Sequence, residues 1–147
     1  MIRIIVLDFF NVILLPQHMP DVEESLLSDP TGLCRVNTEL LEKFRKIQEE
    51  KNIPVCIFTA SSPQEYGWLA QELDWVKNIY TSTKMGLSKG DVDSYTELAE
   101  HMGAIQTEIL FIDDNLSNIS AAKKAGWQTI QYKNKNDLFM RLEPLLS

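Results

Sequence analysis

Two adjacent carboxylates stand directly after an apolar run in the last third of the chain. Residues 109–112 are all apolar, and Asp113 and Asp114 follow them. The first apolar run repeats this order, because Leu7 is followed by Asp8. In α/β sheets the carboxyl ends of strands hold the ligands, and carboxylate oxygens suit hard cations such as Mg²⁺. The sequence therefore predicts a shared Mg²⁺ site at one edge of a sheet.

Strand and helix patterns alternate along the chain, and this alternation positions the carboxylates. It predicts a parallel sheet with helices on both faces. At 147 residues, one domain covering 1–147 is the expected organisation. The expected strands are 2–7, 55–58, 78–81, 109–112 and 127–132. Helical spacing covers 40–47, 95–102, 119–125 and 138–142, and a further helix is expected to start at 62–65.

Three residues are typical of helix ends. Asn37 precedes the first helical pattern, and we expect its side chain to cap that helix. Gly103 and Gly126 follow the helical patterns at 95–102 and 119–125 and are expected to close them.

One segment, residues 14–36, does not fit the alternation. It contains three prolines, one glycine and four acidic residues, and it leaves the sheet just after Asp8. Prolines and glycines at this density interrupt regular structure. We therefore expect an irregular excursion that hangs over the site, with at most one short helix around residues 22–27.

The composition excludes several classes of function. The net charge of −7 argues against non-specific binding to nucleic acid or to anionic membranes. Cys34 and Cys56 are too few for a disulfide framework or a cysteine metal site, and Cys56 is expected to be a buried thiol. The apolar runs are shorter than the about 20 residues that a membrane span needs. We expect a soluble, cytoplasmic protein that binds neither nucleic acid nor membrane.

Four blocks of polar residues follow one another at the expected strand ends. They are residues 8–13, 58–61, 89–95 and 113–118. At these blocks the chain resembles the haloacid dehalogenase superfamily of aspartate-nucleophile hydrolases, most of which are phosphatases. The resemblance covers nearly the whole chain except residues 14–36. It implies a single three-layer α/β/α domain with a Rossmann-like parallel sheet of about five strands in the order 3-2-1-4-5, and a minimal or absent cap.

The resemblance implies a role for each acid group. Asp8 would be the nucleophile, forming an aspartyl-phosphate that divides one difficult step into two. Mg²⁺ would be held by Asp8, the backbone carbonyl of Phe10, and Asp114. Asp113 would bind the Mg²⁺ through water or orient its neighbour Asp114, and Asn118 would support these ligands.

The resemblance also implies which groups would hold a phosphate. Thr59, with its hydroxyl, and Ala60, among the nearby amides, would bind phosphate oxygens. Lys89 would balance the charge of the carboxylates and the phosphate. Asn11 is expected to contribute to substrate binding. Lys84 is the alternative to Lys89, and we expect it to be a surface residue.

The chain departs from the family pattern at position 10. Phosphatases that resemble it carry a second aspartate two residues after the nucleophile, which protonates the leaving group and then activates water. Phe10 occupies that position here. Phenylalanine cannot transfer a proton, and general acid–base catalysis is typically worth about 10²–10⁴ in rate. Both half-reactions should therefore be slowed.

Three hypotheses remain open on the sequence. In the first, the protein is a Mg²⁺-dependent phosphohydrolase with weakened acid catalysis, which favours good leaving groups or borrows an acid from His18, Asp21 or Glu23. In the second, it is a catalytically silent relative that binds Mg²⁺ and a phosphorylated ligand, or a protein partner. The third and least favoured is a dehalogenase-like hydrolase, since such enzymes need no Mg²⁺ set and usually have a larger cap.

The short cap bears on the substrate. A site without a large cap stays open to solvent, which suits a macromolecular substrate or requires a neighbouring subunit as a lid. The expected partner is a phosphorylated small molecule or protein, and a homodimer is one option.

Overall fold

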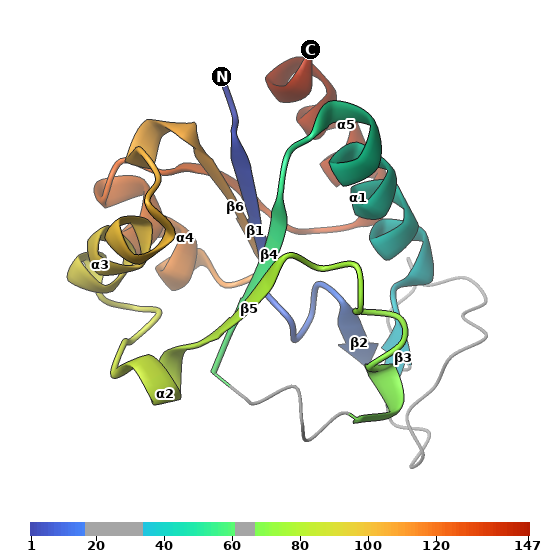
Figure 1. The fold of residues 1–147 in the computed structure, drawn as a ribbon, viewed down its shortest axis with the longest axis horizontal. Helices are drawn as coiled ribbons and strands as arrows, with labels where there is room; N and C mark the ends of the chain where they lie inside the picture. The colour runs from blue at the N-terminus through green and yellow to red at the C-terminus, as the bar shows by residue number, and fades with distance from the viewer. Residues whose placement is uncertain (17–33, 61–66) are drawn as a thin grey trace.

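A five-stranded parallel sheet forms the centre of the molecule (Figure 1). The computed structural model describes residues 1–16, 34–60 and 67–147. Its strands are β1 (Ile4–Leu7), β4 (Val55–Thr59), β5 (Asn78–Thr81), β6 (Ile109–Asp113) and β7 (Gln128–Gln131). They lie in the order β5-β4-β1-β6-β7, with every neighbouring pair parallel. This confirms the expected 3-2-1-4-5 order.

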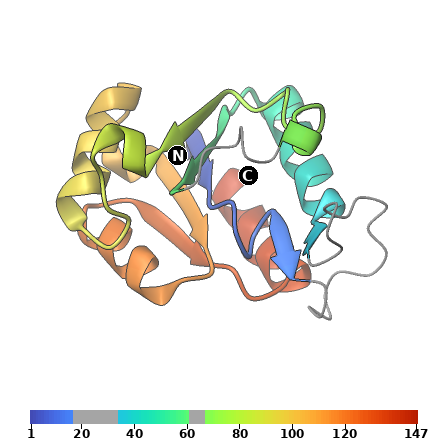
Figure 2. The ribbon, with the colours of Figure 1, turned by 90° about the horizontal axis from the view of Figure 1, so that it is seen from below.

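Helices cover both faces of the sheet, as the alternation predicts. One face carries α1 (Thr38–Lys51) and α5 (Lys135–Leu146), and the other carries α3 (Val92–Met102) and α4 (Leu116–Lys124). Figure 2 shows the two helical layers on opposite sides of the sheet. The sequence also did not predict α2 (Ser82–Met85) or a 3₁₀ turn at Gln106–Glu108. The fold is therefore a three-layer α/β/α arrangement.

Alternation along each central strand divides the core into two clusters. Ile5 and Leu7 of β1 pack on the side of α1 and α5, whereas Val6 packs on the side of α3 and α4. Successive side chains of a strand point to opposite faces, and both faces of these strands are covered by helices. Every residue of β4 and β6 is buried for this reason.

The ends of the 14–36 segment are regular, which corrects the expectation of an irregular excursion. β2 (Leu14–Pro16) and β3 (Cys34–Val36) form a two-stranded antiparallel sheet. Leu14, Leu15 and Val36 are buried, so burial of apolar side chains outweighs the breaking effect of the nearby prolines. The short helix expected around residues 22–27 lies outside the described residues.

The residues expected at helix ends behave differently from one another. Gly103 ends α3 in the left-handed region, with φ 67°, as expected. Ala125 is the cap of α4, and Gly126 follows it with φ 102° and closes the helix as expected, since its N–H donates to the carbonyl of Lys123 at 3.0 Å. Asn37 precedes α1, but its side chain makes no capping hydrogen bond. It donates to the carbonyl of Val12 at 2.9 Å and to the hydroxyl of Tyr132 at 3.0 Å. The helix start expected at 62–65 lies outside the described residues.

Cys56 is buried in β4, and neither cysteine is in a disulfide. Within the described ranges, the helices are too short or too polar to cross a membrane.

Candidate active site

Strand register brings Asp8 and Asp113 to the same place. Leu7 of β1 lies opposite Ile112 of β6, so the next residue of each strand is a carboxylate. The backbone N–H of Asp8 donates to the carbonyl of Ile112 at 2.9 Å and continues the ladder. By the alternation of strand side chains, Asp8 shares a side with Val6, the side that α3 and α4 cover. Both aspartates are buried.

Asp114 completes a cluster of three carboxylates. One oxygen of each of Asp8, Asp113 and Asp114 lies within 4.8 Å of the others. Three carboxylate oxygens are hard donors of the kind that Mg²⁺ prefers, so the donor set fits that ion. Asp114 is only half-buried, so its carboxyl group is open to solvent and to a ligand. Among the described residues, the structure thus supports the predicted cation site.

Lys89 enters this cluster from the loop before α3. Its Nζ donates to Oδ1 of Asp8 and, at 3.1 Å, to the carbonyl of Phe58, and it lies 3.3 Å from Oδ2 of Asp113. The same Nζ lies 5.7 Å from the ring centre of Phe111. Lys84 is exposed in α2, so the structure separates the two lysines as expected.

The Lys89 loop is fixed from α3 by Tyr95. The hydroxyl of Tyr95 donates to the backbone carbonyl of Lys89 at 2.7 Å, and Ser94 Oγ accepts from the N–H of Ser88 at 2.9 Å. The ring of Tyr95 is buried and makes edge contacts with Phe58. Sequence reasoning placed Tyr95 at the end of the block 89–95 and in the apolar stripe of a helix, and gave it no role of its own. Its place six residues after Lys89 was the available signal for a second role.

Asp113 is held by polar groups at the start of α4. Its Oδ1 accepts from the N–H of Asn115 at 2.9 Å, and its Oδ2 accepts from Nδ2 of Asn118 at 3.0 Å. Asn115 also caps α4, since its Oδ1 accepts from the N–H of Asn118. Asn118 therefore lies where the predicted supporting residue should be, in contact with Asp113.

Burial sets the protonation of the two titrating carboxyl groups. It raises the pKa of Asp8 from 3.8 to about 7, an effect that Lys89 opposes and Asp113 reinforces. Burial also raises the pKa of Asp114, with a further rise from Asp113 and a lowering from a hydrogen bond with the side chain of Asn11. A bound cation would favour the charged forms and relieve this cost.

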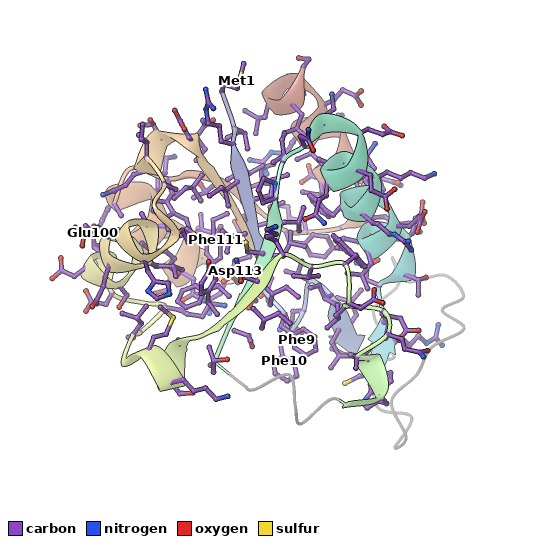
Figure 3. All side chains as sticks on the ribbon, in the orientation of Figure 1. Met1, Phe9, Phe10, Glu100, Phe111 and Asp113 are labelled. Atoms are coloured by element: carbon purple, nitrogen blue, oxygen red, sulfur yellow. The ribbon has the colours of Figure 1, made fainter. Side chains whose placement is uncertain are left out.

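The turn after β1 contributes an apolar surface to the same edge. Phe9 is buried, whereas Phe10 is partly exposed, and the two rings meet edge to face at 5.3 Å. Asn11 has φ 64°, and its N–H donates to the carbonyl of Leu14 at 2.8 Å, which closes the turn. In Figure 3, Phe9 and Phe10 lie beyond Asp113, past the carboxyl end of the sheet.

Thr59 and Ala60 follow Phe58 at the same edge. Thr59 ends β4 and is buried, while the carbonyl of Ala60 accepts from the hydroxyl of Thr83 at 3.1 Å. Their predicted contacts with phosphate remain predictions. The alternative acids His18, Asp21 and Glu23 lie outside the described residues.

Comparison with protein families gives a match over most of the chain. The model of the haloacid dehalogenase-like hydrolases matches residues 33–126, and Asp8 lies before that segment. Enolase-phosphatase E1 of Aquifex aeolicus is 36% identical over 102 residues, which cover 61% of this chain and 43% of that protein. D-ribitol-5-phosphate phosphatase of Bacteroides thetaiotaomicron is 30% identical over 74 residues, covering 50% and 36%. The chain thus spans less than half the length of these relatives.

Solved structures share the fold along nearly the whole chain. A predicted HAD-like family hydrolase from Porphyromonas gingivalis superposes with a TM-score of 0.75 at 18% identity, covering 99% of this chain and 98% of that one. A HAD-family enzyme from Bacteroides thetaiotaomicron, solved with magnesium and inorganic phosphate, gives 0.71 at 15% identity, covering 94% and 99%. At these identities the likeness concerns the fold alone.

Proposed function

The chain belongs to the haloacid dehalogenase-like hydrolase family, and from this premise we propose that it is a Mg²⁺-dependent phosphohydrolase whose nucleophile is Asp8. One observation carries the proposal: Lys89 contacts both Asp8 and Asp113, while Asp114 completes the acidic cluster. A buried cation among three carboxylates can balance an incoming phosphate. The single domain covering 1–147 belongs to the same proposal.

The proposed reaction has two steps. An oxygen of Asp8 attacks phosphorus, the bond from phosphorus to the leaving oxygen breaks, and the leaving group departs with the electron pair. Water then attacks the aspartyl-phosphate, which releases inorganic phosphate and restores Asp8. Bound Mg²⁺, held by Asp8, Asp114 and the Phe10 carbonyl, would polarise the phosphoryl oxygens. Lys89 offsets negative charge throughout, and Thr59, Ala60 and Asn11 would contact the substrate.

The substrate class follows from the relatives and from Phe10. The names of the two relatives support a phosphorylated small molecule as substrate. Position 10 holds no proton donor, so the leaving group must depart with little help from the protein at that point. Protein substrates, a homodimeric lid and a cytoplasmic location remain predictions from the sequence.

Hydrolysis of p-nitrophenyl phosphate tests the proposal. We expect turnover that needs Mg²⁺, is abolished by EDTA and falls by roughly three orders of magnitude or more in Asp8→Asn. Asp74→Asn, an exposed carboxylate outside the cluster, is the matched control and should keep the parent rate. Turnover that survives in Asp8→Asn would contradict the proposal. So would the absence of turnover in a folded protein that binds Mg²⁺.

A further inference from the structure

Phe10 is the exposed member of an otherwise buried apolar turn. It is 37% exposed, whereas Phe9 is 1% exposed and Val12 and Ile13 are fully buried. The left-handed backbone of Asn11 turns the chain back toward the sheet directly after Phe10. Phe10 lies two residues after the proposed nucleophile, so the exposed part of its ring lies near the site.

A second exposed apolar side chain follows the carboxylates of β6, at the start of α4. Leu116 is 64% exposed and begins α4, two residues after Asp114, just as Phe10 lies two residues after Asp8. Two residues of chain span at most about 7 Å, so both side chains start close to the carboxylate cluster. We call Phe10 and Leu116 the apolar rim.

The geometry of the proposed displacement directs the leaving group toward this rim. The attacking and leaving oxygens of a phosphoryl transfer lie roughly in line on opposite sides of phosphorus. Asp8 ends a buried strand, so a phosphate in contact with its carboxylate lies beyond the edge of the sheet, and the leaving group lies farther out still. Phe10 projects past this edge (Figure 3).

The absence of a proton donor at position 10 favours an aryl leaving group. Without a proton donor at position 10, the leaving oxygen must carry negative charge as the bond to phosphorus breaks. A phenol has a pKa of about 10, as tyrosine does, whereas water and simple alcohols are far weaker acids. A phenolate therefore departs far more readily than an alkoxide, and its ring can stack on Phe10.

We infer that the apolar rim selects aryl phosphate monoesters as substrates. The inference rests on the proposed function, because it names the leaving group of that reaction. Asp8 displaces an aryl oxide from phosphorus; the aryl oxide leaves with the electron pair and takes its proton from water, and the aspartyl-phosphate is hydrolysed as before. Phe10 contacts the ring, and Leu116 flanks it.

Pairs of substrates distinguish the effect of ring contact from the effect of leaving-group acidity. Phenyl and 2-naphthyl phosphate release phenols of nearly equal acidity, but naphthyl offers the larger ring. Cyclohexyl phosphate matches phenyl in size but releases an alcohol. We expect kcat/KM to rise from cyclohexyl to phenyl to naphthyl. Phe10→Leu, which keeps an apolar side chain, should reduce the naphthyl preference by about three- to tenfold. Met140→Ala, an exposed apolar residue of α5, is the control and should change nothing.

Binding of phosphonates keeps the inference testable apart from turnover. In the presence of Mg²⁺, benzylphosphonate should bind more tightly than methylphosphonate by calorimetry, and Phe10→Leu should remove that preference while inorganic phosphate binds as before. If hydrolysis depends on Asp8 but Phe10→Leu leaves both preferences unchanged, the proposed function stands and the apolar rim is wrong. If nothing is hydrolysed, the proposed function fails and the selection of substrates fails with it, even where the benzyl preference shows that Phe10 contacts an aromatic ligand.

Comparing phenyl phosphate with phosphotyrosine, free and in a peptide, distinguishes a small-molecule ester from a protein substrate. Free phosphotyrosine, a phosphotyrosine peptide and phenyl phosphate carry the same ester chemistry. Preference for any of them over cyclohexyl phosphate supports the inference and identifies the source. Cyclohexyl phosphate turned over as well as phenyl phosphate would overturn it.

Discussion

The two sides of the site differ in the kind of side chain that forms them. On the side of β6 and α3, which we call the charged side, Asp113 and Lys89 are buried or nearly so, and each has several polar partners. On the side of the turn after β1, the apolar side chains of Phe9 and Phe10 meet the same edge of the sheet. The molecule thus fixes the groups that balance charge firmly and offers no proton-transfer group at position 10.

Phosphatases usually balance charge and protonate the leaving group together, and the two sides of this site separate these requirements. Balancing the charge of a transferred phosphoryl group needs fixed cations and dipoles, whereas protonating the leaving group needs a titratable side chain beside it. The charged side supplies the first through contacts that also hold the core together. Position 10 can change its side chain at lower cost to folding, because the ring of Phe10 is partly exposed. Specificity can therefore vary at the turn while the charged side stays intact.

Removing the positive charge of Lys89 should have the largest effect on stability. In Lys89→Met, Asp8 and Asp113 lose a buried partner, and breaking a buried ion pair costs about 3–5 kcal/mol in the free energy of unfolding. Urea denaturation at pH 8 in EDTA measures this, and p-nitrophenyl phosphate turnover should fall by about 10²–10³. Lys84→Met should stay within about 0.5 kcal/mol of the parent. Equal stability of the two variants would mean that the contacts of Lys89 do not hold the charged side.

The pH dependence of stability should reveal Asp8. Its pKa is raised from 3.8 to about 7 in the folded protein, so the folded state retains a proton that the unfolded state releases between these values. The free energy of unfolding of the metal-free protein should therefore fall as the pH rises from about 4 to about 7, by roughly 3 kcal/mol. Asp8→Asn should flatten this fall. A slope that is the same in parent and variant would exclude Asp8 as its source.

Mg²⁺ should stabilise the folded protein through the carboxylate cluster. A ligand present at 100 times its dissociation constant adds about 2.7 kcal/mol to the free energy of unfolding. Asp114→Ala should lose most of this gain, since it removes a member of the cluster, while Asp74→Ala should keep it. Thermal unfolding with Mg²⁺ and with EDTA measures the difference. An undiminished Mg²⁺ response in Asp114→Ala would show that the cation binds elsewhere.

Much of the fold could be predicted from the sequence, because its strands and helices depend on local residue patterns. Apolar runs and helical spacing located the five strands and their helices, and the resemblance supplied the strand order. Asp8 and Asp113 could be paired in advance because parallel strands in register end together. The choice of Lys89 over Lys84 also came from the resemblance and not from residue type, since both are lysines near the same strand.

The remaining features depend on contacts between distant segments. Asn37 has the sequence position of a helix cap, but its side chain contacts Val12 and Tyr132, because buried polar groups far along the chain compete for it. The hydroxyl of Tyr95 reaches the Lys89 carbonyl only once the loop is folded. The exposure of Phe10 follows from the turn that Asn11 makes. Apart from the position of Tyr95 six residues after Lys89, no local pattern indicates these outcomes.

The dependence of turnover on the leaving group tests most directly whether the site balances charge without transferring a proton. The measurement is kcat/KM for a series of substituted phenyl phosphates, with the parent and Phe10→Asp compared in Mg²⁺. We predict a steep fall in the parent as the phenol becomes more basic. Phe10→Asp should flatten this fall and should raise turnover of the most basic members by up to about 10². A flat dependence in the parent would contradict the prediction, because it would mean that another group protonates the leaving oxygen.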